Sequence, residues 1–371
     1  MILKHARVFQ PSGAFLEKDI CVDGEHFATQ ADGEVFDASG CYAIPGLVDI
    51  HFHGCVGYDF CDGTQEAISA IAKYEASKGV AAICPATMTY PESKLQEICE
   101  AAAAYQTEAD GAELVGINME GPFISEAKKG AQNAAFLHAP DADMFRRLQA
   151  TAQGLLKLVD LAPEVDGAME CIRQLHNEVR ISLAHTGADY ETAMAAFEAG
   201  AKHVTHLYNA MPPFTHRAPG VIGAAADAAD TVELICDGVH VDPSVVRTTM
   251  RMFGADRVCY ISDSMMATGL SDGEYSLGGQ AVTVRGNRAV LANGTIAGSA
   301  TCLLDCLRTA VLKMGVPLGD AVRCATMNPA RAIHIDDRYG SIEAGKVASF
   351  LLLDASLNVK QIFLRGKALA M

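Results

Sequence analysis

The chain has 371 residues, of which 50% are hydrophobic and 20% charged, so it can bury a sizeable core and is not a disordered protein. Lysine and arginine number 29 against 45 aspartates and glutamates, a net charge of −16. This balance lacks the basic footprint of a nucleic-acid binder and disfavours binding to anionic membrane surfaces.

The twelve cysteines are scattered without a CxxC pair. In a chain of this length without a secretory leader, they indicate buried thiols in a reducing compartment. A Pro-Ser-Gly turn at Pro11 comes too early for a signal peptide, and no apolar run approaches the roughly 20 residues of a membrane helix. We therefore predict a cytoplasmic protein without a membrane or nucleic-acid partner.

Short β-like segments occur at both ends of the chain, separated by turns that contain glycine or proline. They cover residues 2–9, 19–22 and 34–36 near the start, and 349–354 and 359–365 near the end. We predict that residues 1–43 and 345–371 form one small discontinuous β-sandwich domain, flanking an inserted unit at 44–344.

The middle of the chain alternates short apolar runs with amphipathic helical stretches. The runs cover 48–53, 81–87, 114–120, 155–162, 180–186, 203–209, 233–238 and 257–263. Helical patterns cover 65–78, 92–105, 141–151, 169–178, 190–199 and 243–253. Eight such units predict an α/β fold with a (β/α)₈ TIM-like barrel, and the alternatives are a doubly wound open sheet or two or three medium domains. A β-hairpin insertion is expected at about 270–298, and helices at 301–314 and 318–325 would close the barrel.

Polar residues that can bind a metal follow several predicted strands. The first ends in His51 and His53, the third in Glu120, the fifth in His185, the sixth in His206 and the eighth in Asp263. In a barrel the carboxyl ends of all strands open on one face, so these side chains would converge.

Each residue of this set also has a simpler interpretation when taken alone. An HxH pair such as His51 and His53 occurs by chance, His185 could be a hydrogen-bonded core residue, and Glu120 could be a buried ion-pair partner. Their joint occurrence at strand ends favours a metal site. The set contains no cysteine and excess carboxylate, which indicates a catalytic zinc rather than a structural one. His203 is expected on the opposite face of its strand from the metal ligands, in a structural role.

Four segments resemble the N-acetylglucosamine-6-phosphate deacetylase family of the amidohydrolase superfamily over essentially the whole chain. They are 45–54 (PGLVDIHFHG), 119–124 (MEGPFI) with the loop 128–131, 205–211 (THLYNAM) and 237–242 (DGVHVD).

The resemblance implies a role for each matching residue. Glu120, His185 and His206 would hold the principal divalent metal ion, a second could bind at His51 and His53 with Glu120 as the bridge, and Asp263 would be the general acid/base. The implied substrate-binding residues are Ala131, Gln132, Asn209, Ala210, Arg217, His240, Ile296, Ala297 and Gly298. The family also implies a homodimer and an amino-sugar phosphate as the small-molecule partner.

The sequence departs from the family at Gln132, where a histidine usually helps to polarise the amide carbonyl. Gln132 can donate a neutral hydrogen bond but cannot become cationic. Either the metal ion polarises more strongly here, or the preferred sugar differs.

The activity implied is hydrolysis of N-acetylglucosamine-6-phosphate to glucosamine-6-phosphate and acetate by metal-activated water. The alternative substrate is a related sugar such as N-acetylgalactosamine-6-phosphate. Two other reaction classes are disfavoured. Ring-opening amidohydrolases bridge their metal ions with a carbamylated lysine, but Lys157 stands too early in its strand for this role. Adenosine-type deaminases have a glutamate soon after the histidine of the fifth strand, and none closely follows His185. A non-enzymatic interaction protein on this scaffold would have lost metal ligands or the catalytic acid, and none is missing.

Overall fold

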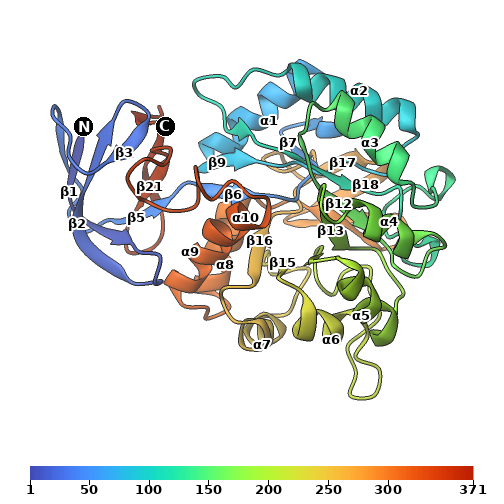
Figure 1. Cartoon of the computed structure of the whole chain (residues 1–371). Coiled ribbons are helices and arrows are strands. Elements are labelled where there is room, and N and C mark those ends of the chain that lie inside the picture. Colours follow the sequence, from blue (N-terminus) through green and yellow to red (C-terminus); the bar gives the residue numbers. More distant parts are fainter. Residues whose placement is uncertain (371) are drawn as a thin grey trace.

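The computed structural model describes residues 1–370 and shows a barrel with a β domain at one side (Figure 1). The barrel strands are β6 (Leu47–Asp49), β9 (Val80–Ile83), β10 (Glu113–Leu114) with β11 (Ile117–Glu120), β12 (Leu156–Leu161), β13 (Arg180–Leu183), β14 (His203–Val204), β15 (Thr231–Ile235) and β16 (Val258–Ile261). Neighbouring barrel strands pair in parallel. The ring closes where the N–H of Asp263 donates to the carbonyl of His51 at 3.0 Å. The (β/α)₈ prediction is therefore confirmed and the open sheet is wrong.

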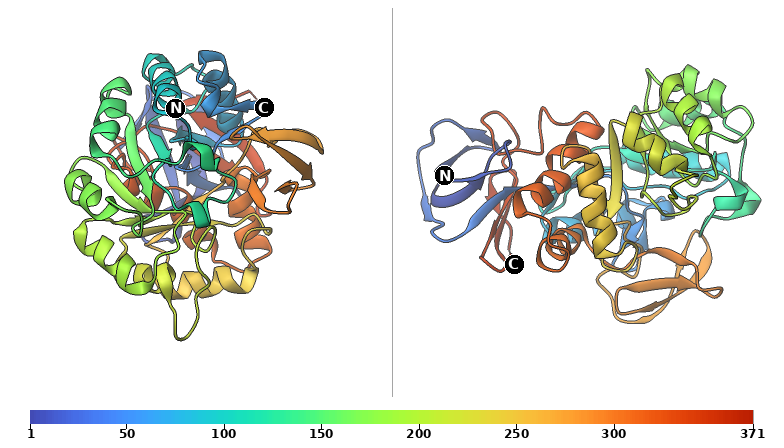
Figure 2. Two further views of the ribbon diagram at one scale, coloured as in Figure 1. Left: turned by 90° about the vertical axis from the view of Figure 1, so that its right-hand side faces the viewer. Right: turned by 90° about the horizontal axis from the view of Figure 1, so that it is seen from below.

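Helices surround this ring and cover its outer face (Figure 2, left). They are α1 (Gln65–Ser77), α2 (Glu92–Ala104), α3 (Ala142–Thr151), α4 (Ala168–Leu175), α5 (Tyr190–Ala199), α6 (Gly220–Ala228), α7 (Pro243–Phe253), α8 (Leu303–Leu312), α9 (Leu318–Ala325) and α10 (Met327–Ala332). Side-chain caps start several of them: Thr64 accepts from the N–H of Ala67, and Asp189 from that of Thr192. Helix α6 was not predicted from the sequence, because Pro219, Gly220 and Gly223 give its first turn the composition of a loop.

Most barrel strands end earlier than the apolar runs had indicated, although β11 ends at Glu120 as predicted. His51 and His53 lie beyond the end of β6, so the expectation that both stand on the strand itself is wrong. At three other candidate site residues the chain turns away from the sheet, with φ of +43° at His185, +28° at His206 and +50° at Asp263. Residues with a Cβ atom rarely adopt this left-handed backbone conformation, and the exceptions are concentrated at functional sites.

Strands from the two ends of the chain share one sheet, in the order β23-β22-β21-β5-β1-β2-β3, with β4 beside β1. Their bounds are β1 (Ile2–Phe9), β2 (Phe15–Asp23), β3 (His26–Ala28), β4 (Val35–Asp37), β5 (Tyr42–Pro45), β21 (Phe350–Leu353), β22 (Val359–Leu364) and β23 (Lys367–Ala368). A hydrophobic cluster separate from the barrel core holds this sheet together, including Phe350 stacked on Phe363 at 4.4 Å between ring centroids. The predicted fold class, a barrel with a small β domain built from both termini, is thereby confirmed.

The insertion after β16 is a four-stranded antiparallel sheet rather than a hairpin. Its strands are β17 (Gly273–Leu277), β18 (Gln280–Arg285), β19 (Arg288–Leu291) and β20 (Ile296–Ser299). A glycine with positive φ stands in each of its three turns, and this conformation allows the segment to reverse direction tightly three times. A parallel bridge between Ser264 and Ser299 attaches this sheet to the segment that follows β16.

Smaller elements complete the chain: the hairpin β7 (Gly54–Cys55) with β8 (Tyr58–Asp59), and the 3₁₀ turns η1 (Phe60–Asp62), η2 (Glu126–Lys128) and η3 (Ala134–Phe136). All twelve cysteines are free, and all but Cys21 and Cys41 are buried. Within residues 1–370, every helix is too short or too polar to cross a membrane.

Candidate active site

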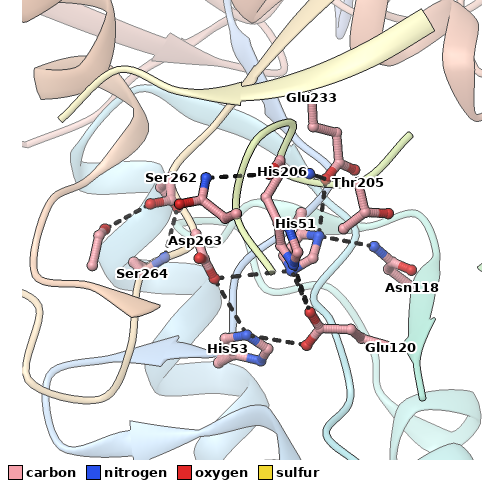
Figure 3. Close-up of polar contacts among 12 residues, drawn as sticks. His51, His53, Asn118, Glu120, Thr205, His206, Glu233, Ser262, Asp263 and Ser264 are labelled. Carbon is pink, nitrogen blue, oxygen red and sulfur yellow. Dashed lines mark hydrogen bonds and ion pairs between the residues drawn. The ribbon is translucent and has the colours of Figure 1, made fainter. Parts of the chain in front are cut away.

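The metal-competent residues predicted from the sequence gather at the carboxyl end of the barrel strands (Figure 3). They come from β11, which ends at Glu120, and from the loops that follow β6, β13, β14 and β16. Glu120 is the centre of the cluster and is only 2% exposed. Its Oε1 atom lies near His185, His206 and His51, and its Oε2 atom lies near His53.

The Oε1 atom of Glu120 faces the first group. It lies 3.0 Å from Nε2 of His185 and 3.2 Å from Nε2 of His206, and these two nitrogens are 3.1 Å apart. Ligands at about 2.0–2.1 Å from a tetrahedral Zn²⁺ would stand about 3.3 Å from one another. The three atoms are therefore spaced as one metal ion requires.

The tautomer of His185 provides a test of this interpretation. Its Nδ1 lies 2.9 Å from the carbonyl oxygen of Lys128, which can only accept, so Nδ1 donates and Nε2 carries the lone pair when the ring is neutral. That lone pair points at the carboxylate of Glu120 and the imidazole of His206. Electron-pair donors brought this close repel one another unless a cation or proton lies between them, so these residues fit a metal ion.

A second group comprises His51, His53 and Asp263. The Oδ1 atom of Asp263 lies 3.3 Å from Nε2 of His53 and 3.9 Å from Nε2 of His51. Glu120 reaches this group as well, at 3.5 Å from Nε2 of His53 and 3.6 Å from Nε2 of His51. The Nε2 atom of His51 is buried without a hydrogen-bond partner among the described residues, as expected of an open ligand atom. The arrangement can hold a second ion bridged by Glu120.

The surroundings of both central carboxylates favour their ionised form. Burial alone would raise the pKa of Glu120, but the nearby His51 and the contacts with His185 and His206 hold that pKa well below its usual range. Burial also opposes ionisation of Asp263, and its hydrogen bond with His53 and the charges of neighbouring histidines lower its pKa. Negative oxygen ligands suit a divalent cation.

Glu233, on β15, contacts residues of the candidate site and was not predicted from the sequence. It is 0% exposed, and Oε2 lies 3.0 Å from Nδ1 of His51 while also accepting from the backbone N–H of His206 at 3.0 Å. His203 contacts its other oxygen at 3.1 Å, in the supporting position predicted for that residue. The sequence did offer one signal for this residue, a charged side chain within an apolar strand run. A buried carboxylate needs partners, so such a residue indicates a polar contact inside the barrel.

A cavity of about 290 Å³ opens over these groups and is lined by residues of the barrel loops and of the inserted sheet. Those predicted from the sequence are His53, Glu120, Ala131, Gln132, His185, His206, Asn209, Ala210, His240, Asp263, Ile296 and Gly298. Met88, Gly130, Leu277 and Thr295 also line the cavity and were not predicted.

Three predicted residues do not line this cavity. His51 lies beneath it, fully buried, and Ala297 is likewise buried, between two residues that do line it. Arg217 is exposed on the loop 212–219, which projects from the molecule beside α6 (Figures 1 and 2). Phe214 on the same loop is 48% exposed.

Gln132 is fixed at both ends of its amide. Its Oε1 accepts from the backbone N–H of Thr89 at 2.7 Å, and its Nε2 donates to Oε2 of Glu120 at 2.7 Å. The remaining N–H lies toward Sδ of Met88 at 3.6 Å. At this position the side chain contacts a candidate metal ligand directly.

His240 is positioned by Asp237, at the end of β15. The Asp237 carboxylate accepts the backbone N–H groups of Val239 and His240 and lies 2.7 Å from Nδ1 of the His240 ring. Burial opposes the charged form of His240, but the hydrogen bond with Asp237 outweighs it and raises the pKa of the imidazole. On the side of β15 the cavity therefore has an imidazole whose charged form is favoured by Asp237.

Residues 42–369 match the amidohydrolase family. The chain is 38% identical over 329 residues to an N-acetylglucosamine-6-phosphate deacetylase of Bacillus subtilis, covering 87% of this chain and 83% of the relative. It is 35% identical over 326 residues to an N-acetylgalactosamine-6-phosphate deacetylase of Escherichia coli O157:H7, covering 87% and 86%.

Solved structures agree over the full length. A variant of the N-acetyl-D-glucosamine-6-phosphate deacetylase from Mycobacterium smegmatis, in complex with N-acetyl-D-glucosamine-6-phosphate, superimposes with a TM-score of 0.92 at 30% identity, covering 100% of this chain and 99% of that one. The N-acetylglucosamine-6-phosphate deacetylase from Pasteurella multocida has a TM-score of 0.92 at 27% identity, with the same coverage.

Proposed function

Because the chain belongs to the amidohydrolase family, we propose that it removes the N-acetyl group of N-acetylglucosamine-6-phosphate, releasing acetate and glucosamine-6-phosphate. The observation that carries this proposal is the convergence of Glu120, His185, His206 and Asp263 on one cavity, in a chain similar to such deacetylases over its whole length. A volume of about 290 Å³ suits a small molecule rather than a polymer.

Glu120, His185 and His206 would hold the principal metal ion, and His51 and His53 a second one. The nitrogen and carboxylate donors favour zinc. When bound, such an ion supplies Lewis acidity and an activated water at neutral pH.

Asp263 performs the proton transfers in this proposal. Its carboxylate lies at the edge of the cavity and is ionised, so it can accept the proton of the attacking water. The protonated Asp263 then donates to the amide nitrogen as the bond to the acetyl carbon breaks, because an amine leaves readily only once protonated.

The sugar phosphate would contact His240 and the segment Asn209–Ala210, which line the cavity. The chain carries a net charge of −16, so an anionic substrate needs local positive groups such as the His240 imidazole. Arg217 does not line the cavity of its own chain. Its contact with the phosphate therefore requires either a movement of the loop 212–219 or a second copy of the chain whose cavity receives this loop. We propose that the chain forms a homodimer with this loop at the interface. We also propose that the protein is cytoplasmic, because its twelve free cysteines would stay reduced there.

N-acetylgalactosamine-6-phosphate is the second candidate substrate. The 35% identity to a deacetylase for that sugar favours it nearly as strongly as the 38% identity favours the gluco epimer.

Acetate release tests both candidates. The purified protein is assayed with N-acetylglucosamine-6-phosphate, its galacto epimer and unphosphorylated N-acetylglucosamine, before and after metal stripping and zinc add-back. The proposal expects the highest kcat/KM with the gluco phosphosugar, loss on stripping and recovery on add-back. Release from neither phosphosugar by the metal-loaded protein would refute the substrate assignment.

A further inference from the structure

Glu233 contacts residues of both candidate metal groups from beneath the cavity (Figure 3). One oxygen, Oε2, lies 3.0 Å from Nδ1 of His51, which belongs to the group with His53 and Asp263. The same oxygen accepts the backbone N–H of His206, which belongs to the group with Glu120 and His185, at 3.0 Å. One buried carboxylate oxygen is thus shared by a residue of each group.

The contact with His51 determines which ring nitrogen is free. A carboxylate can only accept, so Nδ1 of His51 must donate to Glu233 and Nε2 is left with the lone pair. That Nε2 has no hydrogen-bond partner among residues 1–370 and stands 3.6 Å from Glu120 and 3.9 Å from Asp263. Without Glu233, the other contact of Nδ1, with Nδ2 of Asn118 at 3.3 Å, would favour a proton on Nε2, the nitrogen that faces Glu120 and Asp263.

The contact with His206 acts on the backbone. His206 has φ of +28°, a conformation that a residue with a side chain adopts only when its surroundings hold it there. Glu233 holds this turn twice, because its side chain accepts the N–H of His206 and its backbone carbonyl accepts the N–H of Leu207 at 3.0 Å. The direction of the His206 side chain depends on that turn.

Glu233 is itself held in place. Its other oxygen, Oε1, lies 3.1 Å from Nε2 of His203, and Nδ1 of His203 lies 2.7 Å from the hydroxyl of Thr231. His203 is fully buried and does not line the cavity. The chain Thr231–His203–Glu233 therefore restricts the carboxylate to one rotamer.

From these contacts we propose that Glu233 is a positioning residue that supports both metal subsites at once, through the His51 ring and the His206 backbone. This inference rests on the metal-binding part of the proposed function and is independent of the identity of the sugar. Its consequence is that one substitution outside both ligand sets weakens both subsites. Partners that orient metal ligands typically account for 10- to 100-fold in metal affinity.

The test is metal binding by the stripped full-length protein. Wild type, E233Q and E233D are titrated with Zn²⁺ against a chromophoric chelator, and bound metal is counted by elemental analysis. Glutamine keeps the length but loses the charge, and aspartate keeps the charge but is too short to reach both partners. The expected result is a 10- to 100-fold loss of affinity for the more weakly held ion and a smaller loss for the other.

Glu75→Gln is the matched control. Glu75 on α1 is also fully buried, but neither of its carboxylate oxygens has a hydrogen-bond partner in the described chain. Burial raises the pKa of Glu75, so E75Q replaces an equally buried carboxyl group without touching a ligand, and is expected to bind zinc as wild type does.

The outcomes separate the two proposals. If wild type binds no metal, the proposed function fails. If wild type binds metal and folded E233Q and E233D bind it within threefold of wild type, only the role of Glu233 is refuted. If E233Q does not fold, the test uses E233D alone. Its zinc affinity and the rate at which it releases zinc to a chelator are then compared with those of wild type.

Discussion

The Nε2 atom of Gln132 donates a hydrogen bond of 2.7 Å to Oε2 of Glu120. Because the N–H of Thr89 holds the other end of the amide, Gln132 cannot turn toward a substrate without losing both contacts. We therefore expect residue 132 to orient the carboxylate of Glu120 rather than to donate to the acetyl oxygen. The position that departs from the family would then act on the metal ligands.

Gln132→Leu is predicted to impair the metal centre. Leucine has a similar size but leaves Oε2 of Glu120 without its donor in a buried site. We expect zinc affinity to fall 10- to 100-fold and kcat/KM to fall at least tenfold at sub-saturating zinc. Gln149→Leu is the control, because that amide also bonds at both ends, to the backbone of Leu156, far from the cavity. Unchanged zinc affinity in Q132L would contradict this role.

Asp263→Asn is predicted to lower kcat by about 10²- to 10⁴-fold, the usual contribution of a general acid/base. Asparagine cannot accept and return a proton, whereas Glu120, His185 and His206 remain in place. Elemental analysis should therefore still find at least one bound metal ion per chain. Activity within tenfold of wild type would remove Asp263 from the proposed mechanism.

The pH dependence of KM is predicted from His240, whose pKa is raised by Asp237. Since the raised pKa keeps the imidazole cationic to higher pH than usual, binding of an anionic substrate should weaken as pH rises through that value. Asp237→Asn removes the carboxylate, so the inflection in KM should move to lower pH. Steady-state kinetics with the phosphosugar measure the shift, and the unphosphorylated sugar is the control. An inflection that stays in place in D237N would be evidence against His240.

A stability contribution is predicted from Glu113 on β10. Its carboxylate accepts from both terminal nitrogens of Arg338, at 2.7 and 2.8 Å, and from the hydroxyl of Tyr339 at 2.6 Å. Burial opposes ionisation, but these partners lower the pKa of Glu113, so its stabilisation is present above the unfolded value and is lost as pH falls through the folded one.

Glu113→Gln should therefore lower the free energy of unfolding by about 1 kcal/mol at pH 7. The corresponding decrease in Tm is about 1 °C, and it should shrink toward pH 4. Glu274→Gln, at an exposed carboxylate bonded only to Thr283, should leave Tm unchanged. An effect of E113Q that grows on acidification would contradict the sign of the pKa shift.

The alternation of apolar runs and helical stretches was sufficient to predict the barrel, because buried parallel strands and covering helices have different periodicities. The bounds of α5, α7 and α9 were predicted to the residue. The bounds 1–43, 44–344 and 345–371 for the domains stay a prediction. The strand ends were placed too late, since His185, His206 and Asp263 continue an apolar run in sequence while their backbone turns into the left-handed region.

The residue types of the site and their places after the strands could be predicted from the sequence alone, because parallel strands bring their carboxyl ends to one face. The supporting contacts became apparent only in the folded chain. Glu233 is 182 positions from His51 along the chain and Gln132 is 43 from Thr89, yet each pair lies within hydrogen-bond distance. The direction of a side chain in such contacts depends on rotamers and loop conformations chosen by the whole packed barrel, and no local pattern encodes them.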